Sequence, residues 1–185
     1  SRGRPQVGYD DRPAANNEAI PVASWSFDGN PLDSSAGAHH GELENASYSP
    51  DVPNAVGEGS ALRFDGASSQ VIIRNYNGIT AGQPRSLAAW VRTSVRGGVI
   101  ASWGSSRAGN KWIFRIENSN GSRGALGVNI SGGYFVGNRN VADGRWHHVA
   151  FAWNPRENRV VLYVDGEEDG DGHLSPRGAV EDTIM

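Results

Sequence analysis

ADGRWHHVAFAW, residues 142–153, and RVVLYVDG, residues 159–166, decide the fold of this chain. Both segments alternate: Val149, Phe151 and Trp153 point to one side of the first segment, and its alanines point to the other. The second segment carries a row of valines and a leucine and ends in an Asp-Gly pair, which favours a tight turn. The two segments therefore predict a pair of strands, each with one apolar face.

The rest of the chain has the composition of an all-β domain. Its 185 residues suit one domain, and its 25 glycines, 9 prolines and 37% hydrophobic residues suit many short strands joined by turns. No segment shows the apolar period of an amphipathic helix, and no apolar run has the length that spans a bilayer. We therefore expect two packed antiparallel sheets with a core between them.

Turn-forming pairs such as Asp28-Gly29 and Asp65-Gly66 separate the expected strands. We place the strands at residues 23–27, 41–48, 61–64, 70–74, 86–92, 99–103, 111–117, 125–130, 134–137, 146–153 and 159–164. Residues 1–20 are polar and without periodicity, so we expect a linker or arm there. Residues 21–185 then form the folded domain.

The same alternation predicts which side chains form the core. Three strands carry apolar rows on one face: Trp112, Phe114 and Ile116; Leu126, Val128 and Ile130; and Leu87, Ala89 and Val91. Trp90 lies on the opposite face of the last of these strands, so we expect that strand to be central in its sheet. Burial of the six tryptophans would contribute on the order of 2–3 kcal/mol each.

Charge and cysteine content narrow the function. The net charge of −3 argues against nucleic-acid binding driven by phosphate neutralisation. Of the 17 basic residues only Lys111 is a lysine, and the forked guanidinium of arginine suits acidic ligands, although a biased genome composition explains the same count. The chain has no cysteine, so it offers neither a disulfide nor thiolate chemistry.

Further sequence blocks follow one another in an order that carries a family resemblance. They are WSFDGN at 25–30, DSS at 33–35, HHG at 39–41, ALRFDG at 61–66, QVII at 70–73, SLAAWVR at 86–92 and GVIASW at 98–103. Together with the two segments quoted above, they resemble the laminin-G-like, concanavalin A-like jelly-roll domains of bacterial secreted proteins. Each block alone is a strand and a turn, whereas the ordered set extends from about residue 22 to residue 166.

The resemblance implies an all-β, two-sheet antiparallel jelly-roll sandwich. It also implies a non-catalytic, carbohydrate-binding module of a larger secreted protein, located outside the cell or at its surface. The expected partner is a polysaccharide or glycan, an acidic one if the arginines serve it, with no nucleic acid and no membrane insertion. Family members continue past the Tyr-Val-Asp-Gly turn into further strands, so we expect residues 167–185 to supply only part of that ending.

Two other functions stay open at this point. An unfinished sheet could be completed by another domain or chain, which would make this a structural or adhesion module. Glucanases of this fold resemble one another in a strand bearing Glu-x-Asp-x-x-Glu or Glu-x-Asp-x-Glu, whose alternate carboxylates act together. Glu42 and Glu44 share a face but lack the Asp and the third carboxylate, so we assign no catalytic residue and expect no enzyme.

Calcium is the cofactor that the resemblance implies. In laminin-G-like domains the loop that follows the first strand often holds a structural calcium ion. Here that loop offers Asp28, Asn30 and Asp33, whose carboxylate and amide oxygens are ligands of the type that calcium prefers. The alternative is that the aspartates only stabilise turns. The acidic stretch 167–171 has no EF-hand spacing and is expected to be a solvated loop.

A glycan site needs an aromatic platform and planar polar groups that bind hydroxyls. Arg115 and Asn129 face away from the core rows on consecutive strands, and Trp103, Tyr134 and Arg139 lie at strand ends or in loops. We predict these five as ligand-binding residues; the alternative is that Trp103 packs under its loop and the arginines are solvated. His148 is expected to be a hydrogen-bonded structural histidine.

Overall fold

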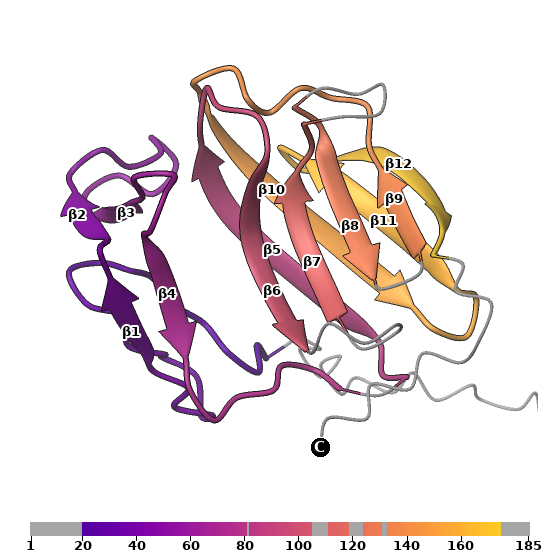
Figure 1. Cartoon of the computed structure of the whole chain (residues 1–185), viewed down its shortest axis with the longest axis horizontal. Coiled ribbons are helices and arrows are strands. Elements are labelled where there is room, and N and C mark those ends of the chain that lie inside the picture. The colour runs from indigo at the N-terminus through magenta and orange to yellow at the C-terminus, as the bar shows by residue number, and fades with distance from the viewer. Residues whose placement is uncertain (1–19, 81, 105–110, 119–123, 131–132, 175–185) are drawn as a thin grey trace, which may run out of the picture.

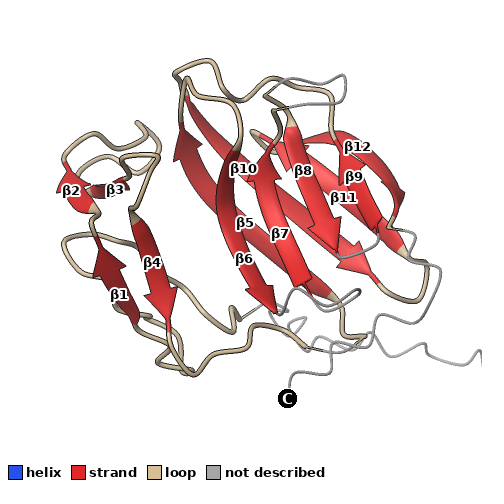
Figure 2. Cartoon of the chain, viewed as in Figure 1, coloured by secondary structure: helices blue, strands red, loops and turns tan. Residues whose placement is uncertain are grey.

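The computed structural model describes residues 20–80, 82–104, 111–118, 124–130 and 133–174. All of the expected arm except Ile20 lies outside these residues, as does the end of the chain from residue 175. The described part folds into strands, turns and bends without a helix (Figure 2). It accordingly holds no helix of the length and apolarity that a membrane crossing requires.

Twelve strands make up the described part of the fold. They are β1 (Gly41–Glu44), β2 (Ser47–Ser49), β3 (Ala61–Arg63), β4 (Gln70–Ile73), β5 (Arg85–Arg92), β6 (Gly98–Gly104), β7 (Lys111–Ile116), β8 (Leu126–Ile130), β9 (Gly133–Val136), β10 (Trp146–Asn154), β11 (Arg159–Val164) and β12 (Glu167–His173).

Two four-stranded antiparallel sheets face one another. One has the order β6-β7-β8-β9 and the other the order β12-β11-β10-β5, and the two lie one in front of the other in Figure 1. The strands β10 and β11 are the two segments that decided the fold, paired antiparallel from Val149↔Val164 to Asn154↔Arg159. The predicted two-sheet sandwich is therefore confirmed.

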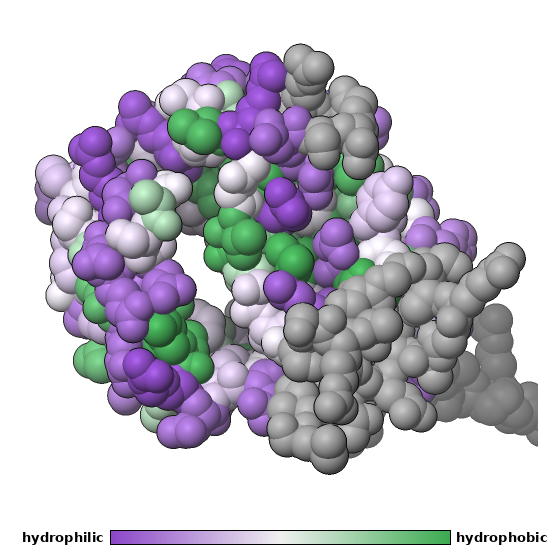
Figure 3. Space-filling view, in the orientation of Figure 1, coloured by the Kyte–Doolittle hydropathy of each residue, from purple (hydrophilic) through white to green (hydrophobic). Residues whose placement is uncertain are grey.

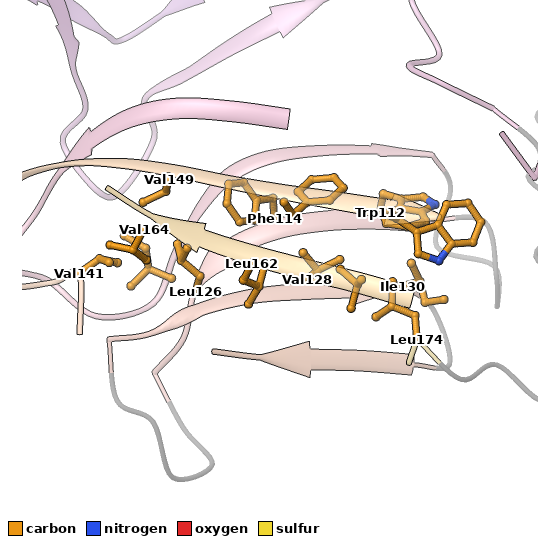
Figure 4. Packing of buried hydrophobic residues seen from close by; sticks show 14 of the residues in the cluster. Trp112, Phe114, Leu126, Val128, Ile130, Val141, Val149, Leu162, Val164 and Leu174 are labelled. Carbon is orange, nitrogen blue, oxygen red and sulfur yellow. The ribbon is translucent and has the colours of Figure 1, made fainter. Parts of the chain in front are cut away.

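The core lies between these sheets, and alternation along each strand fills it. Trp112, Phe114 and Ile116 of β7 face Phe151 and its neighbours on β10, and all are nearly inaccessible to solvent (Figure 4). The rings of Phe114 and Phe151 meet edge to face with their centroids 5.2 Å apart, a favourable aromatic geometry. The predicted row on β5, Leu87, Ala89 and Val91, is partly buried and packs against the same cluster.

A smaller part of the fold precedes β5. It contains two two-stranded sheets, β1-β4 and β2-β3, at one side of the sandwich (Figure 1). The space-filling view shows an opening between this part and the sandwich (Figure 3). The hydrogen bonds that do connect the two parts are consequently informative, and Asp51 makes two of them.

The first predicted strands are shorter than expected. Residues 23–27 form no strand in the described structure but a single antiparallel bridge, Trp25↔Asp33. The expected strand 41–48 is divided into β1 and β2 because Asn45 adopts a left-handed φ of 52°. Asparagine tolerates that conformation better than most residues, so the chain turns there.

The acidic stretch 167–171 was expected to be a solvated loop, which is wrong. It belongs to β12, which pairs with β11 through a bulge between Leu162 and Tyr163. Asp169 is buried and accepts hydrogen bonds from the backbone N–H groups of Asn138 and Arg139 at 3.1 Å and 2.9 Å. The carboxylate thus ties β12 to the segment that follows β9.

Two further expectations about the sheets are wrong. Among the described strands β5 lies at the end of its sheet and pairs only with β10, so it is not central. The six tryptophans are not all buried either: Trp112 and Trp153 are in the core, whereas Trp90 is 39% exposed on the outer face. A strand with apolar groups on both faces can therefore present one of them to solvent.

Candidate functional site: a tryptophan-lined pocket

An open pocket of about 550 Å³ lies on the outer face of the sheet β12-β11-β10-β5. Its walls come from the loop after β2, from facing ends of β5 and β10, and from the turns that flank β10 and β11. The residues that line it are Pro53, Asn54, Ala55, Trp90, Arg92, Gly144, Arg145, Trp146 and Asp165.

Alternation along β5 and β10 places the aromatic side chains of the pocket outside the sandwich. Because Val91 packs against the core, Trp90 and Arg92 on either side of it face outward. In the ladder Arg92 pairs with Trp146 and Trp90 pairs with His148. The rings of Trp90 and His148 meet edge to face with centroids 5.2 Å apart, which supports the exposed indole.

Asp51 holds the loop wall of the pocket against the sheet. Arg92 donates from Nη1 to Asp51 Oδ2 at 2.5 Å, and Trp146 donates from Nε1 to Asp51 Oδ1 at 3.1 Å. Arg92 also donates from Nε to the carbonyl oxygen of Gly144 at 2.8 Å. One carboxylate therefore fixes the guanidinium, the indole and the loop that continues into residues 53–55.

His147 fixes the turns at the other side of the pocket. It is buried, unlike His148, and its Nδ1 lies 2.8 Å from Asp165 Oδ2 while its Nε2 lies 3.1 Å from Asp143 Oδ1. The backbone N–H of His148 donates to Asp165 Oδ1 at 2.9 Å. The structural histidine is thus His147, with both ring nitrogens bonded, whereas the sequence analysis assigned that role to His148.

The electrostatics of this cluster favour its charged forms. Burial disfavours charge on His147, but hydrogen bonds to Asp165 and Asp143 outweigh burial and raise the pKa of the imidazole. Burial would likewise raise the pKa of Asp165, yet the hydrogen bond from His147 and that from the His148 backbone lower it. The pKa of Asp143 is lowered first by Arg145 and then by His147. The imidazole of His147 thus lies between two carboxylates that favour its protonated form.

These groups can recognise a polyhydroxylated ligand. An exposed indole offers an apolar face on which a sugar ring can stack. Of the five N–H groups of a guanidinium, Arg92 uses two in the hydrogen bonds above, and the others can donate to hydroxyl oxygens. Asp165 and Asn54 add carboxylate and amide groups to the wall of the pocket. Apolar surface with a few directed polar groups is typical of small-ligand sites.

The structure brings together three of the five predicted ligand-binding residues, on the other side of the sandwich. Asn129 pairs with Tyr134 in the ladder β8–β9, and Arg115 lies on the same outer face of the sheet β6-β7-β8-β9. Tyr134 is 64% exposed, and Arg115 Nε lies 3.4 Å from Glu117 Oε1. Apolar and polar side chains are intermixed on the molecular face that Figure 3 shows.

The other two predicted residues lie elsewhere. Trp103 packs at the margin of the core, where its ring stacks on that of Trp112 with centroids 6.0 Å apart. Arg139 donates from Nη2 to Glu167 Oε2 at 2.5 Å, and its backbone N–H bonds Asp169. Trp103 is packed, as in the alternative weighed for it. For Arg139 the alternative was a solvated side chain, whereas the structure places it in an ion pair with Glu167.

A comparison with protein-family models decides the family. Residues 65–183, well over half of the chain, match the model Laminin_G_3, described as the concanavalin A-like lectin/glucanase superfamily. This chain belongs to the concanavalin A-like lectin/glucanase superfamily. The resemblance read from the ordered sequence blocks is therefore confirmed.

Two solved structures are similar to this chain, and the first of them supports its fold. One is domain 4 of AbnA, a GH43 extracellular arabinanase from Geobacillus stearothermophilus, in complex with arabinotriose. It is 19% identical, has a TM-score of 0.66, and the match covers 88% of this chain and 78% of that one. Mouse laminin α1 domains LG4-5 match at 15% identity and a TM-score of 0.43, over 57% of this chain and 27% of that one. A comparison with curated proteins found no match.

The loop that the superfamily resemblance assigns to calcium is organised around Asp33. This carboxylate is buried. Its Oδ1 accepts hydrogen bonds from the backbone N–H groups of Ser24 and Ser35, and its Oδ2 accepts them from the Ser35 hydroxyl and the backbone N–H of His39, all at 2.8–2.9 Å. Burial would raise the pKa of Asp33, but these donors lower it. A cation would have to displace them, so the arrangement does not fit calcium bound through Asp33.

The other two predicted calcium ligands also make hydrogen bonds within the loops. Asp28 Oδ1 accepts the backbone N–H of Ser60 at 2.9 Å, and Asn30 Oδ1 accepts that of Leu32 at 3.0 Å. Within the described ranges no three His, Asp or Glu side chains are grouped as a metal site would require. Calcium at this loop stays a prediction from the sequence, which a chelation experiment decides.

Sequence reasoning missed the tryptophan-lined pocket. The available signal was the pattern of β5 and β10 in this superfamily member: Trp90 and Trp146 lie on the faces opposite their core rows. An aromatic residue on the outer face of a strand is a candidate platform. Asp51 could not have been found in this way, because 95 residues separate it from Trp146.

Proposed function

We propose that this domain binds a carbohydrate in the pocket lined by Trp90 and Trp146. The observation that carries the proposal is the placement of two indoles beside Arg92, Asn54 and Asp165 on a rigid sheet face. The membership of the chain in a superfamily of lectins and glucanases supports a sugar as the ligand. The arabinotriose complex of the similar arabinanase domain supports it at the level of fold.

We propose binding without catalysis. A general acid in sugar hydrolysis needs a carboxyl group whose pKa is raised. Where the described structure shifts the pKa of a carboxyl group, at Asp33, Asp65, Asp143 and Asp165, the shift is downward in each case. Such groups remain carboxylates, which suits hydrogen-bond acceptance from hydroxyls. The proposed setting is a secreted protein with further domains that act on the same polysaccharide.

The test is glycan binding by the wild-type chain and by two matched variants. Trp90→Ala removes one of the two indoles from the pocket, and Tyr134→Ala removes an aromatic group from the opposite face of the sandwich. Arabinotriose is the first probe, followed by an array of plant and bacterial oligosaccharides. We expect Trp90→Ala to weaken binding about 5- to 150-fold, as the loss of ~1–3 kcal/mol of ring burial implies, and Tyr134→Ala to leave it unchanged.

Either of two results would contradict this proposal. Absence of binding across the array would remove the carbohydrate function. Loss of binding in Tyr134→Ala but not in Trp90→Ala would move the site to the outer face of β6-β7-β8-β9, where three residues predicted from the sequence lie together. Circular dichroism spectra of both variants establish that they are folded.

A further inference from the structure

The arginines that line the tryptophan-lined pocket are paired with carboxylates. Arg92 is paired with Asp51 at 2.5 Å, and Arg145 Nη2 is paired with Asp143 Oδ2 at 2.6 Å. Asp165 lines the pocket and is bonded to His147. Both guanidinium groups that line the pocket therefore already have a carboxylate partner, and the third carboxylate accepts a hydrogen bond within the fold.

The same pairing extends to other arginines of the domain. Arg74 is paired with Glu42, Arg115 with Glu117, Arg139 with Glu167 and Arg159 with Asp171. The high arginine content suggested an acidic ligand at the sequence level. In the folded chain these guanidinium groups already have carboxylate partners, so they give no argument for an acidic ligand.

An anionic sugar would meet a penalty in this pocket. Its carboxylate could bind Arg92 only by competing with Asp51 or by accepting repulsion from it, and like charges at close range cost free energy. A hydroxyl group has no such conflict, because it can accept from the guanidinium and donate to a carboxylate at once. Arginine–carboxylate pairs are thus suited to neighbouring hydroxyls of one sugar ring.

Resting on the proposed function, we infer that the pocket takes an uncharged sugar and that Asp51 determines this preference. Asp51 neutralises Arg92 and orients the indole of Trp146 through its second oxygen. It also anchors the loop that supplies Pro53, Asn54 and Ala55 to the pocket wall. Asp51 is accordingly a specificity-determining and positioning residue.

The experiment compares binding of neutral and uronate oligosaccharides to the whole chain. The probes are arabino-, xylo- and gluco-oligosaccharides and, as anionic counterparts, galacturonate and glucuronate oligosaccharides, measured by titration calorimetry. Wild type is expected to bind a neutral probe at least about tenfold more tightly than any uronate probe. The affinity of wild type for the neutral probe should change less than about twofold between low and high salt, because an uncharged ligand offers no charge for salt to screen.

The informative variant is Asp51→Asn, which is isosteric and removes the negative charge. We expect this variant to bind neutral probes about threefold to tenfold more weakly than wild type and uronate probes more tightly. Its affinity for uronate probes should fall as the salt concentration rises, because salt screens the attraction between the uronate and Arg92. Asp171→Asn is the matched control, since it breaks a comparable exposed ion pair with Arg159 on the same sheet. The control should retain the wild-type ratio of neutral to uronate affinity.

Several outcomes would overturn the inference and leave the proposed function standing. One is a wild-type preference for uronate probes that salt weakens. Another is an unchanged ratio of neutral to uronate affinity in Asp51→Asn when thermal melting shows that the variant is folded. If Asp51→Asn unfolds, Arg92→Gln tests the same pairing: the inference requires that it weaken neutral binding without creating a uronate preference. Absence of glycan binding by wild type would remove the proposed function itself.

Discussion

Replacing one tryptophan between the two sheets, and one on the outer face of the sheet β12-β11-β10-β5, tests the sandwich directly. Trp112 is 1% exposed, and Trp90 is 39% exposed on the outer face. The ring of Trp112 lies 5.9 Å from that of Phe151 and 5.1 Å from that of Trp153, between centroids. The same change to alanine therefore removes a core contact in one case and a surface contact in the other.

The expected losses differ several-fold. Truncating a fully buried Trp costs about 3–5 kcal/mol, because the lost transfer free energy is joined by a cavity that the neighbours fill only in part. Trp90→Ala should cost about 1 kcal/mol or less, since its ring leaves neither a cavity nor an unpaired buried group. For a domain of this size the melting temperature should fall by roughly 6–20 °C in Trp112→Ala and by a few degrees in Trp90→Ala.

Urea denaturation followed by circular dichroism, with thermal melts in parallel, measures both losses. Equal losses in the two variants, or a loss below about 1 kcal/mol in Trp112→Ala, would refute the assignment of these faces. If Trp112→Ala does not fold, Trp112→Leu keeps more of the volume and should still lose clearly more stability than Trp90→Leu.

Three further predictions concern single groups. The pKa of His147 is raised on folding, so its protonated form should stabilise the fold below the unfolded pKa of 6.5, and this contribution should be lost as pH rises through the folded pKa. His147→Gln should therefore lower the free energy of unfolding more at about pH 6 than at about pH 9. An equal loss at both pH values would contradict this. Gly137→Ala would place a methyl group against the buried carboxylate of Asp169 and should cost about 1–3 kcal/mol in denaturation, whereas Gly98→Ala, with open space around it, should cost less than 1. Excess chelator should leave the melting temperature unchanged because Asp33 already has its donors, and a fall in that temperature would restore the predicted calcium site.

The core of this fold could be predicted from sequence because its signal is local. Alternation within β7, β8 and β10 identifies the buried face of each strand without knowledge of its partner. The strand β12 could not be predicted, because its glycines and carboxylates lack that alternation. It is a strand because it pairs with β11 and because Asp169 is buried. At β12 the contacts with the rest of the fold therefore outweigh the low β-propensity of glycine and of acidic residues.

The pocket could be predicted only in part. Alternation places Trp90 on the face opposite the core row of its strand, but it does not connect this indole to Trp146 or to a site. That connection depends on the ladder that places Arg92 opposite Trp146 and on the carboxylate of Asp51, which comes from a distant loop. Three of the five predicted ligand-binding residues do share a face: Arg115, Asn129 and Tyr134. They do so because consecutive strands usually pair and side chains alternate along each strand.

The position of β5 has a consequence for the exchange of amide protons. Within the described strands its only ladder partner is β10, so alternate peptide N–H groups along Arg85–Arg92 point away from any neighbouring strand. Those amides should take up deuterium early, while the intervening ones, bonded to β10, should resist until the sheet opens. A period-two pattern of protection along this single strand would show that its outer border is accessible to water.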